Sequence, residues 1–216
     1  GYYLLSRLNP NLKDFSVGQT AYIGIQPSLV AVEEGQAFIN VTPEGVGVVV
    51  GGYGDVVVPA KVDKDGKSYP VMKVREHAFN VPSSDYDTWF EDYKNEFVTR
   101  ITLPESVTEI GALAFPSLYL KEVNLPSSIR KIGANAFFYS RQLEKVSIPS
   151  VEAWLNIDFE PNVLESGFPQ YMSNPIWNTD NSFKGRLYIG GKEATDIVIP
   201  ASIKEVKPYV FCGYQF

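Results

Sequence analysis

The sequence predicts a mainly β fold, a right-handed solenoid with short parallel strands, hairpin insertions and little helix. Two observations predict it. A seven-residue line that is apolar at its first, fourth and sixth positions and ends in proline begins at Val98, Leu120 and Leu143. These starts lie 22 and then 23 residues apart, and a fixed period of this length indicates repeats that stack into a coil. A second line, Ile-Gly-Ala-x-Ala-Phe, follows twice, at Ile110 and Ile132.

The first line has the alternation of a short strand that is buried on one face. Successive side chains of a strand point to opposite faces, so Ile101 and Leu103 are expected in the core and Arg100 and Thr102 on the outside. Proline lacks an amide hydrogen and ends the strand at once. Strands this short let each turn double back, as in a leucine-rich repeat.

The second line places small and aromatic residues where the coil turns its corners. Gly111 and Gly133 are expected to adopt positive φ at those corners. Phe115 and Phe137 are each expected to stack on the phenylalanine of the neighbouring turn. The serines that lie two residues after the prolines are expected to hydrogen-bond to turn backbone groups; they are Ser106 and Ser128.

Two imperfect units extend the array. The early one starts at Val56-Val-Val58-Pro59 and contains an insertion around residues 64–67 that reads as a hairpin turn. The late one, Ile197-Val-Ile199-Pro200, is expected to supply a further strand. We therefore divide the chain into an N-terminal β cap or appendage, residues 1–54, and one continuous repeat array, residues 55–216, with units starting near residues 55, 98, 120, 143 and 194.

The cap is expected because the end turns of a solenoid must cover an otherwise exposed core. Residues 20–25 read as a strand, and residues 37–41 and 46–50 read as a hairpin. No comparable cap follows the last repeat, so we expect the C-terminal edge to pair with further repeats or with another chain.

The full unit, Val-x-x-Ile-x-Leu-Pro-x-Ser-Val-x-x-Ile-Gly-x-x-Ala-Phe, resembles the BspA-type leucine-rich repeat of bacterial surface proteins. The resemblance covers residues 37–216, and the segment around Trp154 with Ser173-Asn174-Pro175 is similar to the hairpin-bearing variant of that family. It implies secretion, cell-surface display and adhesion to host or neighbouring-cell proteins. It also implies that the single cysteine, Cys212, is a packed thiol, and it brings no catalytic residue.

Composition narrows the range of partners. The chain has 216 residues, 44% of them hydrophobic, with a net charge of −6 and a pI near 4.9. This balance argues against nucleic acid, which binds clusters of Lys and Arg. No stretch is long and apolar enough to cross a membrane. The chain starts at Gly1 and shows no secretion signal, so we expect that the signal or anchor of the secreted or surface protein implied by the resemblance is not present in this chain.

Residue types that carry catalysis are sparse. His77 is the single histidine, and we interpret it as a turn residue partly in solvent. The acidic run within residues 85–96 lacks the spacing of a calcium loop, and its aromatic residues fit one face of a short helix packed on the repeats. Glu152, Asp158 and Glu160 leave a glycosidase-like carboxylate pair as a remote alternative. We predict no catalytic residue, no metal site and no cofactor.

The outward strand positions are the candidate ligand site. They are expected to form one continuous polar face made of Arg100, Thr102, Glu122, Asn124, Lys145, Ser147 and Asp196, with Val198 beside them. Aromatic residues of the insertions, Trp154 above all, are expected to hold those insertions on the core. The function favoured is a non-enzymatic, secreted or cell-surface binding module for an extracellular protein or glycan. A structural spacer within a longer repeat protein and, more remotely, a glycan-active enzyme are the alternatives.

Overall fold

The structure is a computed structural model of the whole chain. It describes residues 29–30, 35, 37–52, 54–79, 98–115, 119–138, 140, 142–163, 169–170, 173–176 and 185–212. The strand expected at residues 20–25 and the short helix expected within residues 85–96 lie outside the described residues.

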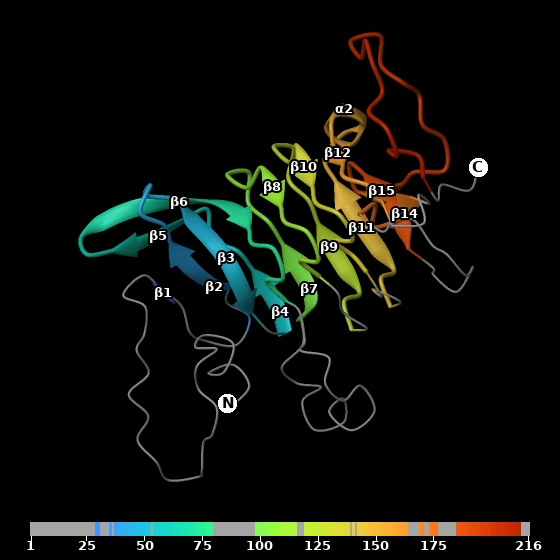
Figure 1. Cartoon of the computed structure of the whole chain (residues 1–216). Coiled ribbons are helices and arrows are strands. Elements are labelled where there is room, and N and C mark those ends of the chain that lie inside the picture. The colour runs from blue at the N-terminus through green and yellow to red at the C-terminus, as the bar shows by residue number, and fades with distance from the viewer. Residues whose placement is uncertain are drawn as a thin grey trace, which may run out of the picture.

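Successive repeats lie side by side and build a first sheet from the strands of the first repeat line (Figure 1). The strands run in the order β4 (Gly54–Val57), β7 (Val98–Thr102), β9 (Glu122–Asn124), β11 (Lys145–Ile148) and β15 (Arg186–Ile189). All neighbours among these five are parallel. The short β16 (Lys192–Glu193) pairs with the outer edge of β15 in the antiparallel direction. The strands expected at the three clear repeats are therefore confirmed.

A second sheet collects the other half of each repeat. Its order is β1 (Leu29–Val30), β2 (Ala37–Val41), β3 (Gly47–Gly52), β6 (Lys67–Val74), β8 (Glu109–Ile110), β10 (Lys131–Ile132) and β12 (Asp158–Phe159). The pairs β1–β2 and β2–β3 are antiparallel, whereas all later neighbours are parallel. β5 (Lys61–Lys64) forms with β6 the hairpin expected around residues 64–67. The hairpin expected at residues 37–41 and 46–50 is confirmed by β2 and β3. Sequence reasoning missed β8, β10 and β12, because strands of two residues show no alternation.

The core lies between the two sheets. Ile101 and Val123 of the first sheet are completely buried and join Ile110 of the second in one hydrophobic cluster. The expected aromatic stack is confirmed, since the ring centroids of Phe79 and Phe115 are 4.9 Å apart and those of Phe115 and Phe137 are 5.4 Å apart. Stacking of this kind locks each turn onto the next and adds about 0.5–1.5 kcal/mol per pair beyond burial.

The corner glycines have a different role from the expected one. Gly111 and Gly133 do not adopt positive φ; instead, a Cβ on Gly133 would lie within 3.0 Å of the Ala112 backbone of the preceding turn. The left-handed position falls two residues later, at Leu113 (φ 49°) and Asn135 (φ 54°). The glycines are therefore required by close backbone packing rather than by their own φ.

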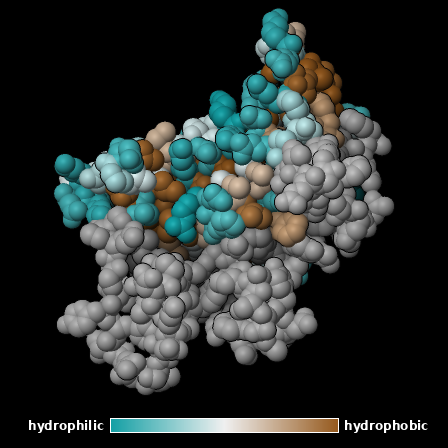
Figure 2. Space-filling view, in the orientation of Figure 1, coloured by the Kyte–Doolittle hydropathy of each residue, from teal (hydrophilic) through white to brown (hydrophobic). Residues whose placement is uncertain are grey.

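The late unit departs from the prediction. Ile197, Val198 and Ile199 form no strand; Arg186–Ile189 supplies the strand beside β11 instead. The reason is that Leu187 and Ile189 match Val146 and Ile148 in register, and β16 then occupies the outer edge of β15. Val198 is 81% exposed, and Figure 2 shows hydrophobic residues on this projecting segment.

An insertion after β11 is held by buried polar contacts. The short helix α2 (Val151–Leu155) is capped by Ser150, whose hydroxyl accepts a hydrogen bond from the Ala153 amide. Trp154 is fully buried, and its indole Nε1 donates to the carbonyl oxygen of Val210 at 3.1 Å. The expected anchoring role of Trp154 is confirmed. A separate pair, β13 (Asn162–Val163) and β14 (Pro169–Gln170), is antiparallel.

Candidate binding face

The outward residues of the first sheet form two rows that cross its five parallel strands, and we call these rows the candidate face. The first row consists of Asp55, Arg100, Glu122, Lys145 and Arg186. The second row consists of Val57, Thr102, Asn124, Ser147 and Tyr188. The intervening residues are the buried ones, so the repeat alternation itself sets which side chains reach the surface.

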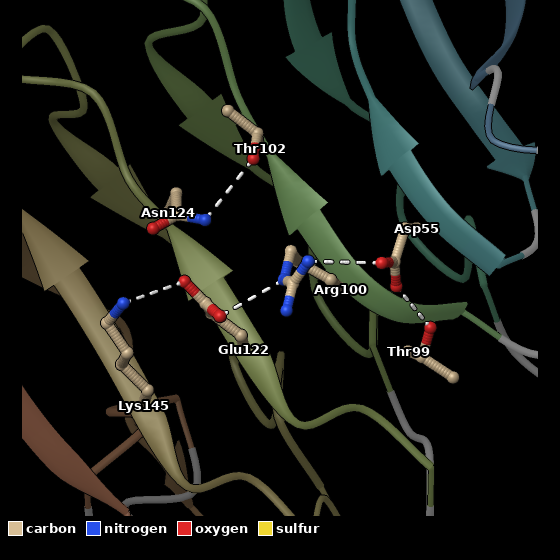
Figure 3. A network of polar contacts seen from close by, with 7 residues as sticks. All are labelled: Asp55, Thr99, Arg100, Thr102, Glu122, Asn124 and Lys145. Carbon is tan, nitrogen blue, oxygen red and sulfur yellow. Dashed lines mark hydrogen bonds and ion pairs between the residues drawn. The ribbon is translucent and has the colours of Figure 1, made fainter.

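The first row is a ladder of alternating charge (Figure 3). Arg100 donates from Nη1 to Oδ2 of Asp55 at 3.1 Å and from Nε to Oε2 of Glu122 at 3.0 Å. Lys145 Nζ donates to the other oxygen of Glu122 at 3.0 Å. Thr99 completes the end of the ladder by donating its hydroxyl to Oδ1 of Asp55 at 2.7 Å. The register of the parallel strands brings these opposite charges together.

Glu122 is the central acid of the ladder, and its side chain is only 18% exposed. Burial alone would raise its pKa, but hydrogen bonds from Lys145 and Asn124 and the charges of Lys145 and Arg100 together lower the pKa below its ordinary value. Glu122 is therefore ionised at neutral pH.

The side chains of the second row make fewer hydrogen bonds than those of the first row. Asn124 Nδ2 donates to the hydroxyl of Thr102 at 3.2 Å. Among the residues that the structure describes, the hydroxyl groups of Ser147 and Tyr188 make no hydrogen bond. Lys145 Nζ lies 5.4 Å from the centroid of the Tyr188 ring, a cation–π arrangement. Polar groups are thus left open toward the β15 end of the face.

The alternation of charge breaks at that same end. Lys145 is in register with Arg186, so two cations stand side by side where the pattern calls for an acid. Arg186 is 66% exposed, and Glu193 of β16 reaches its Nη1 from the side at 3.2 Å. Like charges in register are unfavourable in a sheet.

Six of the seven predicted face residues lie together, and one does not. Asp196 is exposed and lies outside both sheets, next to Thr195. Sequence reasoning missed Asp55, Arg186 and Tyr188. The alternation of Leu187 and Ile189 was a signal for the last two, because a residue between two inward positions must point outward.

The other candidate chemistry is accounted for by local contacts. His77 adopts φ 56°, is 43% exposed and lies 3.2 Å from Glu76, as expected of a turn residue. Glu160 pairs with Lys131 on the second sheet. Burial raises the pKa of the Cys212 thiol, which is partly buried. Within the described ranges, no group of three or more His, Cys, Asp or Glu residues could hold a metal ion.

The expected turn contacts of the serines are present. Ser106 donates its hydroxyl to the carbonyl oxygen of Ala60 at 3.1 Å, and Ser128 donates to that of Val107 at 2.7 Å. Each bond joins one turn to the preceding one, which keeps the strands of the face in register.

Comparison with known proteins identifies the repeat. A family model described as a BspA type leucine rich repeat region, with six copies, matches residues 90–163. Among curated proteins, nothing matches. A solved leucine rich cell surface protein from Faecalibacterium prausnitzii A2-165 is similar, with 22% identity over 60% of this chain and a TM-score of 0.38. The pneumococcal vaccine antigen PcpA is also similar, with 19% identity over 61% of this chain and a TM-score of 0.39. This chain covers 35% and 40% of those two chains, respectively.

Proposed function

We propose that this chain, whose residues 90–163 match a BspA type leucine rich repeat region, is a non-enzymatic binding module of a bacterial cell surface. In this proposal the repeats coil as a right-handed solenoid, and residues 1–54 cap its N-terminal end. The candidate face then recognises an extracellular protein or glycan, and the module is secreted or displayed by a signal or anchor.

The observation that carries this proposal is the continuity of the candidate face. Five parallel strands each present two outward side chains in register, so the face is extended and polar rather than a closed cleft. Repeat proteins use extended faces of this kind for binding. None of the described helices is long and apolar enough to span a membrane.

The test is binding of the purified chain to a panel of matrix proteins, mucins and glycans. The test variant replaces Arg100, Asn124 and Lys145 with alanine. Its matched control replaces Lys73, Glu109 and Lys131, which form a similar charged row on the second sheet: Lys73 pairs with Glu109 at 2.7 Å, and Glu109 is in register with Lys131. Saturable binding that only the first variant loses supports the proposal.

A spacer is the second candidate function, and the charge ladder favours it. Arg100, Glu122 and Lys145 already satisfy one another, so this part of the face stabilises the stack without a ligand. A chain that binds nothing on the panel, or whose binding survives the loss of Arg100, Asn124 and Lys145, argues for the spacer and against a ligand at the candidate face.

A further inference from the structure

The break in the charge ladder marks a place where the first row has a second cation in the position of an acid. From Asp55 to Lys145, each outward residue of the first row has the opposite charge to its neighbour and forms an ion pair with it. The next position is Arg186 rather than an acid. Places where a local rule is broken while the rest of the pattern holds are expected at functional sites.

We infer that Lys145 and Arg186, together with Tyr188 and Ser147, form a subsite for a carboxylate-bearing saccharide. The inference rests on the proposed binding function and deepens it by naming the ligand class. A carboxylate placed against Lys145 and Arg186 completes the alternation that the four preceding residues follow. Arg186 offers a planar fork of donors that fits a carboxylate, and Glu193 touches only one of its terminal nitrogens.

The neighbouring second-row residues select a sugar. Tyr188 is in register with Ser147 on β11, and both hydroxyls are without hydrogen bonds among the described residues. A partly exposed tyrosine ring beside open hydroxyl groups packs against the carbon face of a sugar while bonding to its hydroxyls. An acidic peptide would form ion pairs with the two cations, but it would neither pack against the tyrosine ring nor hydrogen-bond to both hydroxyl groups as a sugar does.

The charge of the whole chain sets the kind of acidic glycan. The net charge of −6 repels densely charged polyanions at long range. One or a few carboxylates directed at a local pair of cations are tolerated, because the surface field is screened beyond about 8–10 Å at ordinary ionic strength. The ligand is therefore a short glycan segment with one or a few carboxylates, as in a uronic-acid oligosaccharide.

Calorimetric titration of the intact chain with trigalacturonic acid tests the inference, with the methyl ester of the same trisaccharide as the neutral comparison. The acid is expected to bind, and the ester is expected to bind at least about tenfold more weakly, since charged hydrogen bonds contribute on that scale. Arg186→Gln and Tyr188→Ala are each expected to lower the affinity for the acidic trisaccharide about tenfold.

Two matched variants separate the subsite from general charge. Lys73→Gln removes one positive charge from β6 of the second sheet, where Lys73 pairs with Glu109 and takes no part in the candidate face. Lys61→Gln removes one positive charge from the exposed hairpin strand β5. Neither is expected to change binding more than about twofold. Arg186→Glu places an acid in register with Lys145, so it should abolish binding of the acid while the variant stays folded by circular dichroism.

The outcomes distinguish this inference from the proposed function. Equal binding of acid and ester, no binding of the acid at millimolar concentration, or an Arg186→Gln variant that binds normally overturns the acidic-saccharide subsite. Equal binding of a hexaglutamate peptide that survives Tyr188→Ala also overturns it. If the chain still binds another member of the protein and glycan panel through the candidate face, the proposed function stands without the subsite; if nothing binds, both fall.

Discussion

Gly133 lies so close to the backbone of Ala112 in the preceding turn that a Cβ atom at Gly133 would overlap with that backbone. Backbone does not move aside as a flexible side chain does, so Gly133→Ala must separate two turns. We expect it to cost about 3 kcal/mol or more of unfolding free energy, at the upper end of overpacking changes. Urea unfolding measures this loss.

The neighbouring substitution Ala134→Gly is the control for that experiment. It also changes one methyl group in the same turn, and it should cost about 0.5–1 kcal/mol through backbone entropy alone. If Gly133→Ala proves no more costly than Ala134→Gly, the close approach of the two turns is not what requires the glycine.

Replacing Leu113 should stabilise the protein, because this residue adopts a left-handed backbone conformation that suits few side chains. Its φ is 49°, and the matching residue of the next repeat is Asn135 at 54°. Asparagine tolerates this region, so Leu113→Asn is expected to raise the unfolding free energy by about 0.5–1 kcal/mol. Thermal unfolding beside Ala112→Asn, at a residue without positive φ, measures the difference; a loss of stability at Leu113 would contradict the prediction.

The parts of the fold that could be predicted from sequence are those with long-range periodicity. The alternation around Ile101 and the proline after it specify a short strand with one buried face, and the recurrence of Phe115 as Phe137 specifies a stack. The hairpin of residues 37–41 and 46–50 could be found in the second sheet, but the short strands that continue this sheet could not. Glu109–Ile110 and Lys131–Ile132 are too short to show a pattern, and only the stacking of the turns brings them together.

The candidate face was predictable residue by residue but not as a network. Arg100, Glu122 and Lys145 were each expected to point outward. Their mutual ion pairs depend on the strand register, which is a property of the assembled sheet. Asp196 was misplaced because the Ile197–Ile199 segment matches the repeat line as well as Leu187–Ile189 does, and the competition between two similar segments is decided by packing.

Glu105 should make stability depend on pH. Hydrogen bonds from the Ser127 amide and then from the Ser127 hydroxyl, with a further one from the Ser128 amide, lower its pKa below the ordinary value. A carboxylate whose pKa is lower in the folded state stabilises that state above its unfolded pKa of about 4.3, and the contribution is lost as pH falls through the folded pKa.

The comparison variant for this effect is Glu105→Gln. Because Glu105 is exposed, we expect the variant to lose no more than about 1 kcal/mol at pH 7. The difference from the unsubstituted chain should shrink toward zero as pH falls below about 4. Urea unfolding at a series of pH values measures it, and a difference that stays constant down to pH 2 would mean that ionisation of Glu105 is not involved.

Reversing the charge of Glu122 should destabilise the sheet in a salt-dependent way. Glu122→Lys gives four consecutive cations in the first row, because Arg100, Lys145 and Arg186 are already positive. Two cross-strand pairs change from attractive to repulsive, and we expect a loss of about 1–2 kcal/mol at low salt. Raising the sodium chloride concentration should reduce this loss, because salt screens the repulsion between the cations. The variant that also carries Asp55→Lys, Arg100→Glu and Lys145→Glu restores opposite charges along the whole row and should recover most of the stability. Absence of recovery would show that the ladder contributes little.

Trp154 should control the packing of the last described segment. Its Nε1 donates to the carbonyl oxygen of Val210, and Asn174 Nδ2 holds the carbonyl oxygen of Tyr209 at 2.8 Å. Trp154→Phe removes the indole donor and part of the buried volume, so we expect a loss of about 2 kcal/mol.

The specific consequence of that change is exposure of Cys212, whose amide donates to Tyr209 within the same segment. Burial raises the pKa of this thiol, which slows its reaction in the folded chain. In Trp154→Phe, the rate of Cys212 alkylation should rise severalfold under native conditions. Phe159→Leu is the matched control, because Phe159 packs against Trp154 with centroids 5.3 Å apart but makes no hydrogen bond to Val210. Equal acceleration in both variants would indicate general loosening of the core and would contradict a specific role for the indole hydrogen bond.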